Sequence, residues 1–439
     1  MNDGRLRDRS VASSAMRKVY WRILPLICLA YLCAYMDRVN VSFASVQMNV
    51  DLQFSATIYG LGGGLFFLGY ALFEVPSNLL LVRFGARQWL ARIMVTWGLL
   101  AVGMMFVQTP MQFYLMRFLL GVAEAGFFPG VIYYFAVWFP TAFRGRAVSR
   151  FYVASPLASI VMGSISGWLL DLNGVGGLRG WQWVFLVQGL PSIVAGLLIL
   201  LFLPDAPGSA KWLSELERTW LQRTLAGEAV SIGEPTSHNV LAAFRNRRAL
   251  MLGVIAFLLL GATTSFNLSA PAVLIASTGL DTTRVGYLVS AGGLVGAVVM
   301  LVTGRYSDSS GDRLLTAFAF AIALTGAYLT LGVSTSPMIV GVAYLLFAST
   351  CFTVSMLLAS SWADVIHVRE LAVGAAVINT LGNIGAFVMP YGWGVARDAT
   401  GNFQSGIMAL TAATVVSGAL ILLLRSRVLK SQPLVVAAA

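Results

Sequence analysis

The chain has 439 residues, of which 58% are hydrophobic and 11% are charged, and its formal net charge is +11. A soluble domain carries about 25% charged residues, so a chain this apolar would aggregate in water, and we infer that lipid is its solvent. The positive charge does not indicate nucleic-acid binding, because its distribution follows the membrane topology described below.

Long continuous apolar runs predict membrane-spanning α-helices rather than barrel strands, whose apolar residues alternate. Backbone groups at lipid depth have no water partner and must pair within the helix, so we expect an all-α integral membrane protein. Breaks at polar, Pro and Gly clusters delimit twelve expected spans, at residues 22–45, 57–81, 88–108, 111–138, 146–170, 182–203, 250–276, 284–304, 314–333, 338–362, 371–395 and 403–424.

The basic residues orient these spans. Most of the Lys and Arg residues fall in tails and loops that would share one side of the membrane, whereas only Arg179, Arg284 and Arg397 fall on the other. The positive-inside rule therefore predicts that both termini are cytoplasmic. The N-terminal stretch is polar and basic and precedes a full-length span, so we expect no cleavable signal peptide and a location in the bacterial inner membrane.

The first span carries Asp37 and Arg38 at lipid depth. A charge there costs from about 2.5 to more than 10 kcal/mol and usually marks function. Desolvation favours the neutral form of a carboxyl and a nearby Arg favours the charged form, so Asp37 is a candidate proton carrier. Arg38 stays charged and presents a planar fork that matches a carboxylate, which makes it a candidate anion-binding residue. The alternative for Arg38 is neutralisation of Asp37.

The second span carries Glu74 near its interior end, just before Pro76. A supporting or gating salt bridge is expected for Glu74 in preference to proton transport. The turn that follows is short, basic and contains Gly, with Arg83 and Arg87 as candidate gating residues.

The fourth span carries Arg117 and Glu124, which are two helical turns apart and therefore share one face. Either charge left unpaired would cost several kcal/mol, so this face is expected to point into the bundle and meet Asp37 or Arg38. We predict that Glu124 and Asp37 both carry protons. The alternative is a buried salt-bridge network that only fixes helix packing, and pairing with Glu124 would fully explain Arg117.

Residues 204–249 form the longest polar segment and separate two sets of six spans. The expected organisation is a cytoplasmic tail (1–21), a six-helix bundle (22–203), a cytoplasmic linker (204–249), a second bundle (250–425) and a C-terminal tail (426–439). The turn after span eight echoes the basic, Gly-containing turn after span two. Two pseudo-symmetric bundles around a central cavity would support alternating access by rocking.

The second half has few charges at lipid depth, so its candidates are polar and uncharged. Asn379 and Asn383 are four residues apart in a Gly-rich span and would share one surface toward a ligand. Tyr70 in the first half is a similar candidate. The alternative is that these side chains only join helices by hydrogen bonds. Asp308, in the turn after span eight, is a candidate gating residue.

Six motifs have a family likeness: Asp37-Arg38-Val39-Asn40-Val41-Ser42-Phe43-Ala44, Pro76-Ser77-Asn78, Arg117-Phe118-Leu119-Leu120-Gly121-Val122-Ala123-Glu124-Ala125-Gly126, Trp138-Phe139-Pro140, Asn379-Thr380-Leu381-Gly382-Asn383-Ile384-Gly385 and Asp398-Ala399-Thr400-Gly401. Through them the chain resembles the major facilitator superfamily and, within it, the anion:cation symporter family. The resemblance covers about residues 20–425.

The resemblance implies inward symport with protons of organic anions such as sugar acids, tartrate-like dicarboxylates, phthalate and other aromatic acids, or allantoate-like compounds. In similar transporters the acids that match Asp37 and Glu124 are the protonation sites, and the Arg that matches Arg38 holds the anion. The positions of Tyr70 and Asn379 match substrate contacts.

The chain departs from the superfamily pattern in the turn after span two. The usual Gly is Asn78 and the usual Asp is Val82, although Arg83 and Arg87 are kept. The gate salt bridge that uses that Asp is therefore not expected. The second copy keeps Asp308 but has Ser309 where Arg is common.

We predict a monomeric, proton-coupled symporter that imports a small organic anion across the lipid bilayer, without a cofactor or metal. The alternative is a proton-driven exporter of an anionic or amphipathic metabolite or drug on the same fold. An enzyme is not expected, because His238 lies in the linker and His367 in an interior loop, and neither assembles a site. Arg38 beside Asp37 disfavours export of cations.

Overall fold

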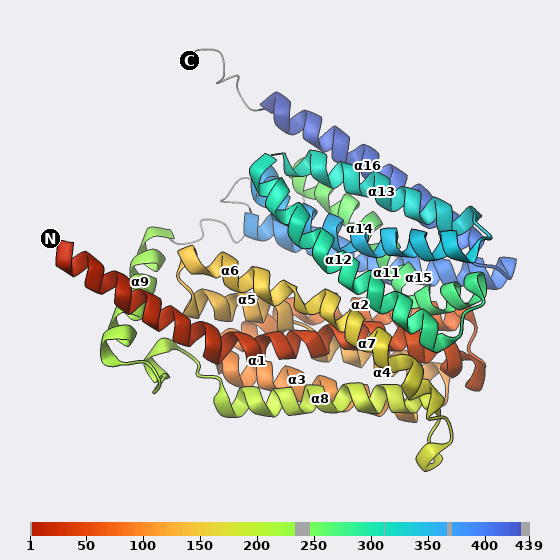
Figure 1. The fold of residues 1–439 in the computed structure, drawn as a ribbon, viewed down its shortest axis with the longest axis horizontal. Coiled ribbons are helices and arrows are strands. Elements are labelled where there is room, and N and C mark those ends of the chain that lie inside the picture. Colours follow the sequence, from red (N-terminus) through yellow and green to blue (C-terminus); the bar gives the residue numbers. More distant parts are fainter. Residues whose placement is uncertain (1, 233–245, 311, 367–370, 432–439) are drawn as a thin grey trace.

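The computed structural model describes residues 2–232, 246–310, 312–366 and 371–431 (Figure 1). All regular elements in these ranges are helices. The first half contains α1 (Asn2–Asp51), α2 (Ala56–Phe84), α3 (Ala86–Gly103), η1 (Met104–Phe106), α4 (Pro110–Glu124), α5 (Phe127–Trp138), α6 (Thr141–Tyr152), α7 (Ala154–Asp171), η2 (Val175–Gly177) and α8 (Gly180–Phe202).

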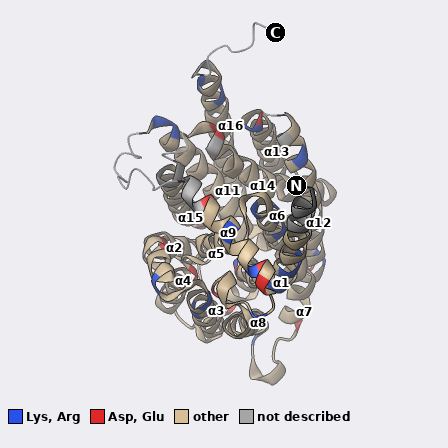
Figure 2. Cartoon of the chain, turned by 90° about the vertical axis from the view of Figure 1, so that its left-hand side faces the viewer, with Lys and Arg blue, Asp and Glu red and all other residues tan. Residues whose placement is uncertain are grey.

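The linker contains the 3₁₀ turn η3 (Pro207–Ser209) and α9 (Glu215–Ile232). The second half follows with α11 (Arg247–Thr278), α12 (Thr282–Ser310), α13 (Arg313–Val333), α14 (Pro337–Val365), α15 (Leu371–Thr400) and α16 (Gln404–Ser431). We call the end of the molecule that holds α9 and the N-terminus the linker end (left in Figure 1), and the other the opposite end. Viewed from the linker end, α2, α3, α4 and α8 lie below α11, α13, α14 and α16 (Figure 2).

The helices are built to cross a bilayer many times. Among the described residues, eleven helical segments are long and apolar enough to span a membrane, and they match eleven of the twelve expected spans. The twelfth expected span, 371–395, corresponds to α15, which is 30 residues long and carries Asn379 and Asn383. The chain is therefore a multi-pass membrane protein.

The fourth expected span is interrupted. The expected span 111–138 is divided into α4 and α5, because Gly126 has φ +84°, a left-handed conformation that glycine adopts without strain. In the expected span 146–170, α6 and α7 meet at Val153, which keeps helical backbone angles (φ −60°, ψ −22°), so this segment continues through the junction. The break in the fourth span follows directly after Glu124, so this carboxyl group stands at the last residue of a helix within the membrane.

The expected N-terminal tail, residues 1–21, is helical from Asn2 and continuous with the first span. It is joined to the linker by Glu217 of α9, which accepts hydrogen bonds of 2.7 Å from both Lys18 and Ser14. Burial raises the pKa of Glu217, but the hydrogen bonds from Lys18 and Ser14 outweigh it and lower this pKa to about 2. The indole rings of Trp138 and Trp212 stack beside this contact, with centroids 5.7 Å apart.

The two halves meet through α2 with α15 and α7 with α12. In both pairs the backbones of the two helices come into contact toward the opposite end. A Cβ atom on Gly60 would collide with the backbone oxygen of Pro390, and one on Gly163 with the oxygen of Gly286. Small residues allow helices in a membrane to approach this closely and pack by dispersion.

Within the first half, α4 lies equally close to α2. A Cβ atom on Gly121 would fall on the backbone oxygen of Phe66, and one on Gly69 on that of Phe118. This approach brings the face of α4 that carries Arg117 and Glu124 against α2.

We expect Gly121→Ala to destabilise the protein by about 1–3 kcal/mol, because an added methyl group forces α4 away from α2. The measurement is the thermal unfolding midpoint of the purified protein in detergent. Gly326→Ala in α13 is the matched control, since no atom lies within 4 Å of the position that its Cβ would take. Equal midpoints for the two variants would contradict the close contact of α2 and α4.

Candidate functional site

The centre of the first half holds an ion pair between two helices. Arg38 of α1 donates to Glu124 of α4, with Nη2 and Oε1 2.7 Å apart. Glu124 is 2% exposed, whereas the Arg38 side chain is 32% exposed. The cation is therefore partly accessible, while its carboxylate partner is enclosed by protein.

Aromatic rings surround the exposed guanidinium of Arg38. Its Cζ lies 5.1 Å from the ring centre of Tyr35, 5.7 Å from that of Phe66 and 5.9 Å from that of Tyr70. Electron-rich ring faces attract a cation without consuming its N–H donors. Nη2 is bonded to Glu124, and Nε is buried and has no hydrogen-bond partner among the described residues, so the N–H groups of Nη1 are the donors that remain for a second carboxylate.

Asp37 is held by amide side chains. Asn40, one turn further along α1, donates to Oδ1 of Asp37 at 3.5 Å and to Oε1 of Gln188 in α8 at 2.7 Å. Gln188 in turn donates to the backbone oxygen of Cys33 at 3.3 Å. Asp37 is 1% exposed, and its Oδ2 has no hydrogen-bond partner among the described residues.

Glu124 resembles Asp37 in this respect, because its Oε2 also has no hydrogen-bond partner in the described part of the chain. A buried carboxylate oxygen without a partner forfeits its hydration, and a bound proton removes that penalty. The first half thus encloses two carboxyl groups that each have one oxygen free to bind a proton.

Arg117 is also buried, at 3% exposure, on the same face of α4 as Glu124. No carboxylate of the described residues lies within 4.0 Å of it, so the alternative in which Arg117 pairs with Glu124 is not formed, and Glu124 meets Arg38 instead. Side chains seven residues apart are separated by about 10 Å along a helix, and Arg38 reaches Glu124 directly from α1. The guanidinium of Arg117 instead lies 5.0 Å from the ring centre of Phe66.

A second polar contact joins the two halves. Asn379 of α15 donates to both carboxylate oxygens of Glu74 in α2, at 2.9 and 2.7 Å. Glu74 is expected to form a salt bridge, but the residue of the neighbouring helix that contacts it is an amide rather than a cation. Asn383, one turn along α15, is 6% exposed, and its Nδ2 has no partner among the described residues.

Of the predicted gating residues, Arg83 and Arg87 have different partners in the described part of the chain. Arg83 is exposed, with its Cζ 5.6 Å from the ring centre of Phe84. Arg87 pairs with Asp205, which follows α8: Nε and Oδ2 are 3.6 Å apart, and the backbone N–H of Arg87 donates to Oδ1 at 3.1 Å. The side chain of Asp308 lies outside the described part of the structure.

Three further polar residues acquire a role only from the structure. Asn40 and Gln188 connect Asp37 to α8; Asn40 stands in the motif that begins at Asp37, and the signal for Gln188 is an amide inside an apolar span. Asp398 of α15 accepts hydrogen bonds of 3.0 and 2.8 Å from the backbone N–H groups of Ala56 and Thr57. It thereby ties the two halves together at the opposite end.

Among the described residues no group of three or more His, Cys, Asp and Glu side chains is placed to bind a metal ion.

Comparison with known proteins agrees with a transport fold. The sequence profile of the Major Facilitator Superfamily matches residues 27–390.

A protein of Agrobacterium vitis named "Putative tartrate transporter" is 40% identical, and the match covers 93% of this chain and 91% of that protein. The "Quinolone resistance transporter" of Acinetobacter baumannii is 36% identical, with 90% and 91% covered. The solved structure of a bacterial homologue of the human lysosomal transporter Spinster, inward-facing and unoccupied, superposes with a TM-score of 0.76 at 15% identity, with 93% of this chain and 98% of that chain covered.

Proposed function

The chain belongs to the Major Facilitator Superfamily, and we propose that it is a proton-coupled symporter that imports a small organic anion across the bacterial inner membrane, with both termini in the cytoplasm. The observation that carries the proposal is the pair of Arg38 and Glu124, in which a partly exposed cation is held by an enclosed carboxylate.

The pair supplies a physical link between proton and anion. While Glu124 is ionised it neutralises Arg38 and competes with any other carboxylate. A proton on Glu124 removes that competition and leaves the guanidinium free for the carboxylate of the solute. Proton binding and anion binding then favour each other by a single coupling free energy, which is reciprocal between the two sites.

Asp37 is the second carboxyl in this proposal. Its Oδ1 accepts a hydrogen bond from Asn40, which also donates to Gln188 of α8, and its Oδ2 is available for a proton. A shift of α1 against α8 changes these contacts, so the tendency of Asp37 to hold its proton would differ between the two states of the transport cycle.

Tyr70, Asn379 and Asn383 complete the proposed substrate site. Tyr70 lies beside Arg38, and Asn379 brings α15 of the second half to α2 through Glu74. We assign Glu74, Arg83, Arg87, Arg117 and Asp308 to the residues whose separate contacts change as the halves open and close. The bond between Glu74 and Asn379 crosses between the halves and must break when they separate.

The proposed solute is a carboxylate such as a dicarboxylate, sugar acid or aromatic acid. Two relatives that are each 40% identical carry the name "Putative tartrate transporter", which supports a dicarboxylate. A planar carboxylate also matches the fork of Arg38.

We expect proteoliposomes with the purified protein to accumulate labelled tartrate, or another acid from a panel of organic acids, when an inward proton gradient is imposed. A protonophore should reduce the internal concentration to the external one, because the gradient is the energy source. Protein-free liposomes give the background. Uptake that is equal with and without the gradient would contradict symport.

A second candidate is a proton-driven exporter on the same fold. Its support is the "Quinolone resistance transporter", which is 36% identical over most of both chains. Quinolones carry a carboxylate, which the fork of Arg38 could hold equally well. The same vesicles distinguish the two. An exporter that exchanges its solute for protons accumulates the solute when the proton gradient is directed outward. Accumulation driven by an inward proton gradient therefore excludes an exporter.

A further inference from the structure

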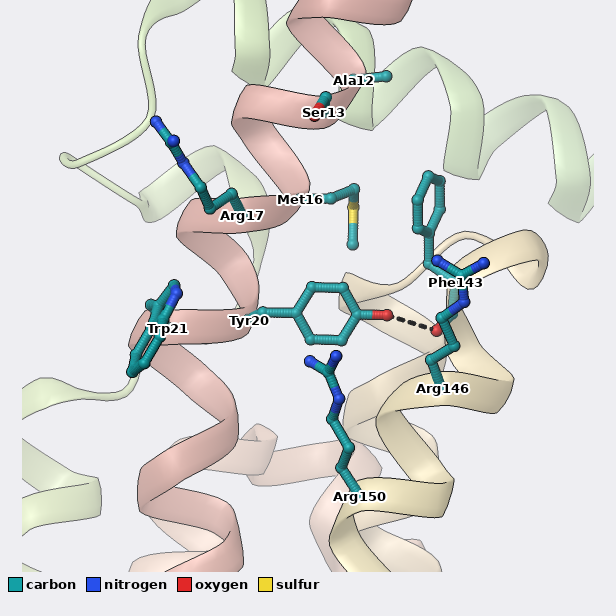
Figure 3. Close-up of a pocket in the computed structure, with 9 residues that line it drawn as sticks. All are labelled: Ala12, Ser13, Met16, Arg17, Tyr20, Trp21, Phe143, Arg146 and Arg150. Carbon is teal, nitrogen blue, oxygen red and sulfur yellow. Dashed lines mark hydrogen bonds between the residues drawn. The ribbon is translucent and has the colours of Figure 1, made fainter.

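A cavity of about 440 Å³ lies between α1 and α6 at the linker end, apart from the site around Arg38 (Figure 3). It is lined by Ala12, Ser13, Met16, Arg17, Tyr20, Trp21, Phe143, Arg146 and Arg150. Three of these nine residues are arginines and none is acidic. The cavity therefore has the charge of an anion-binding site.

These arginines are not occupied by acidic partners. No carboxylate of the described residues lies within 4.0 Å of Arg17, Arg146 or Arg150. Other basic side chains at this end are paired, with Lys18 on Glu217 at 2.7 Å and Arg144 on Glu228 at 3.9 Å. The cavity gathers cations that no carboxylate of the described residues compensates.

One wall of the cavity is fixed by hydrogen bonding. Tyr20 of α1 extends across to α6, where its hydroxyl donates to the backbone oxygen of Phe143 at 2.8 Å (Figure 3). The Cζ atom of Arg150 lies 4.9 Å from the centre of this ring. Arg146 and Arg150 are four residues apart and share one face of α6, so both can direct their donors toward the same ligand.

The outer face of α1 changes from cationic to apolar as it leaves the cavity. Arg17, Trp21, Pro25 and Leu29 recur at intervals of four residues and are all exposed, Trp21 by 76% and Leu29 by 38%. Residues with this spacing form one stripe along a helix. Tryptophan is typical of the membrane–water interface, which places Arg17 at the depth of lipid head groups and Leu29 at that of the acyl chains.

We propose that this cavity binds an anionic phospholipid, whose phosphate is held by Arg146 and Arg150 of α6 and whose acyl chain lies along Trp21, Pro25 and Leu29. Arg17 lies on the same flank of α1 as Trp21 and begins that stripe (Figure 3). Phosphate and guanidinium groups form charge-assisted, often bidentate hydrogen bonds. Basic pockets between membrane helices are suited to lipid head groups. The apolar stripe favours a lipid over free phosphate, which has no chain to place there.

The test is a titration of the full-length protein in phosphatidylcholine-containing micelles with dioleoyl-phosphatidylglycerol, read as the shift of the thermal unfolding midpoint. A saturable upward shift is expected for the wild type. Each basic residue near a membrane surface contributes a similar increment to the free energy of binding anionic lipid. The double variant Arg146→Gln, Arg150→Gln should therefore raise the half-saturating lipid concentration about 30-fold. The double variant Arg146→Lys, Arg150→Lys keeps both charges. Its half-saturating lipid concentration should lie between those of the wild type and the Gln double variant.

Arg305→Gln is the control, because Arg305 is exposed on α12 and does not line the cavity. It should titrate like the wild type. Sodium phosphate and additional phosphatidylcholine form two further arms and should give no saturable shift. An equal shift with sodium phosphate would overturn the lipid assignment, and unchanged half-saturation in both double variants would overturn the site.

Discussion

Glu124→Gln and Asp37→Asn are each expected to abolish concentrative uptake in proteoliposomes. The accumulation ratio should fall to about one, because an amide of the same shape has no carboxyl group to bind the transported proton. Exchange of labelled for unlabelled anion should persist in Glu124→Gln, since that variant resembles the protonated transporter and leaves Arg38 free for the solute.

Measuring both quantities on the same vesicles separates proton coupling from folding. A misfolded variant loses exchange and accumulation together, whereas an uncoupled one loses only accumulation. Glu215→Gln is the matched control, because Glu215 is an exposed carboxylate in the first turn of α9. Full accumulation by both Glu124→Gln and Asp37→Asn would remove these residues from the proton path.

Arg38→Lys should weaken anion binding by about 100-fold. Lysine keeps the charge but loses the planar fork, and a hydrogen bond to a charged group contributes about 1.5–3 kcal/mol. An ammonium carries all its donors on one nitrogen, so Glu124 and the solute carboxylate would compete for the same centre. The loss should appear in the dissociation constant more than in protein stability.

The measurement is the dissociation constant of the transported acid from isothermal titration of the purified protein. Arg284→Lys is the control, since the Arg284 side chain is 70% exposed and lies in a surface pair with Asp281. Wild-type affinity in Arg38→Lys would end the proposed role of Arg38. A loss of affinity in the control as large as that in Arg38→Lys would show that the effect is not specific to the site.

The sequence was a good guide to the helices and a partial guide to the site. The expected spans match eleven spanning segments and α15, yet hydropathy does not predict the break at Gly126. Hydrophobicity registers the apolar length of a segment but not the backbone angle of one residue. The break at Gly126 depends on a positive φ that many glycines in this chain do not adopt.

By itself, the sequence determined that the chain crosses the membrane as helices and that Asp37, Arg38, Glu74, Arg117 and Glu124 are the charges that need an explanation. Those properties are local, because the cost of placing a residue in lipid depends mainly on that residue and its segment.

Only the tertiary structure decided which side chains meet. Glu124 is paired with Arg38 rather than Arg117, and Glu74 with an amide of the other half. Such pairings depend on how closely helices far apart in the sequence approach, which here is set by glycines such as Gly121 that face a backbone oxygen. A contact between two helices is a joint property of both surfaces, so neither segment alone specifies it.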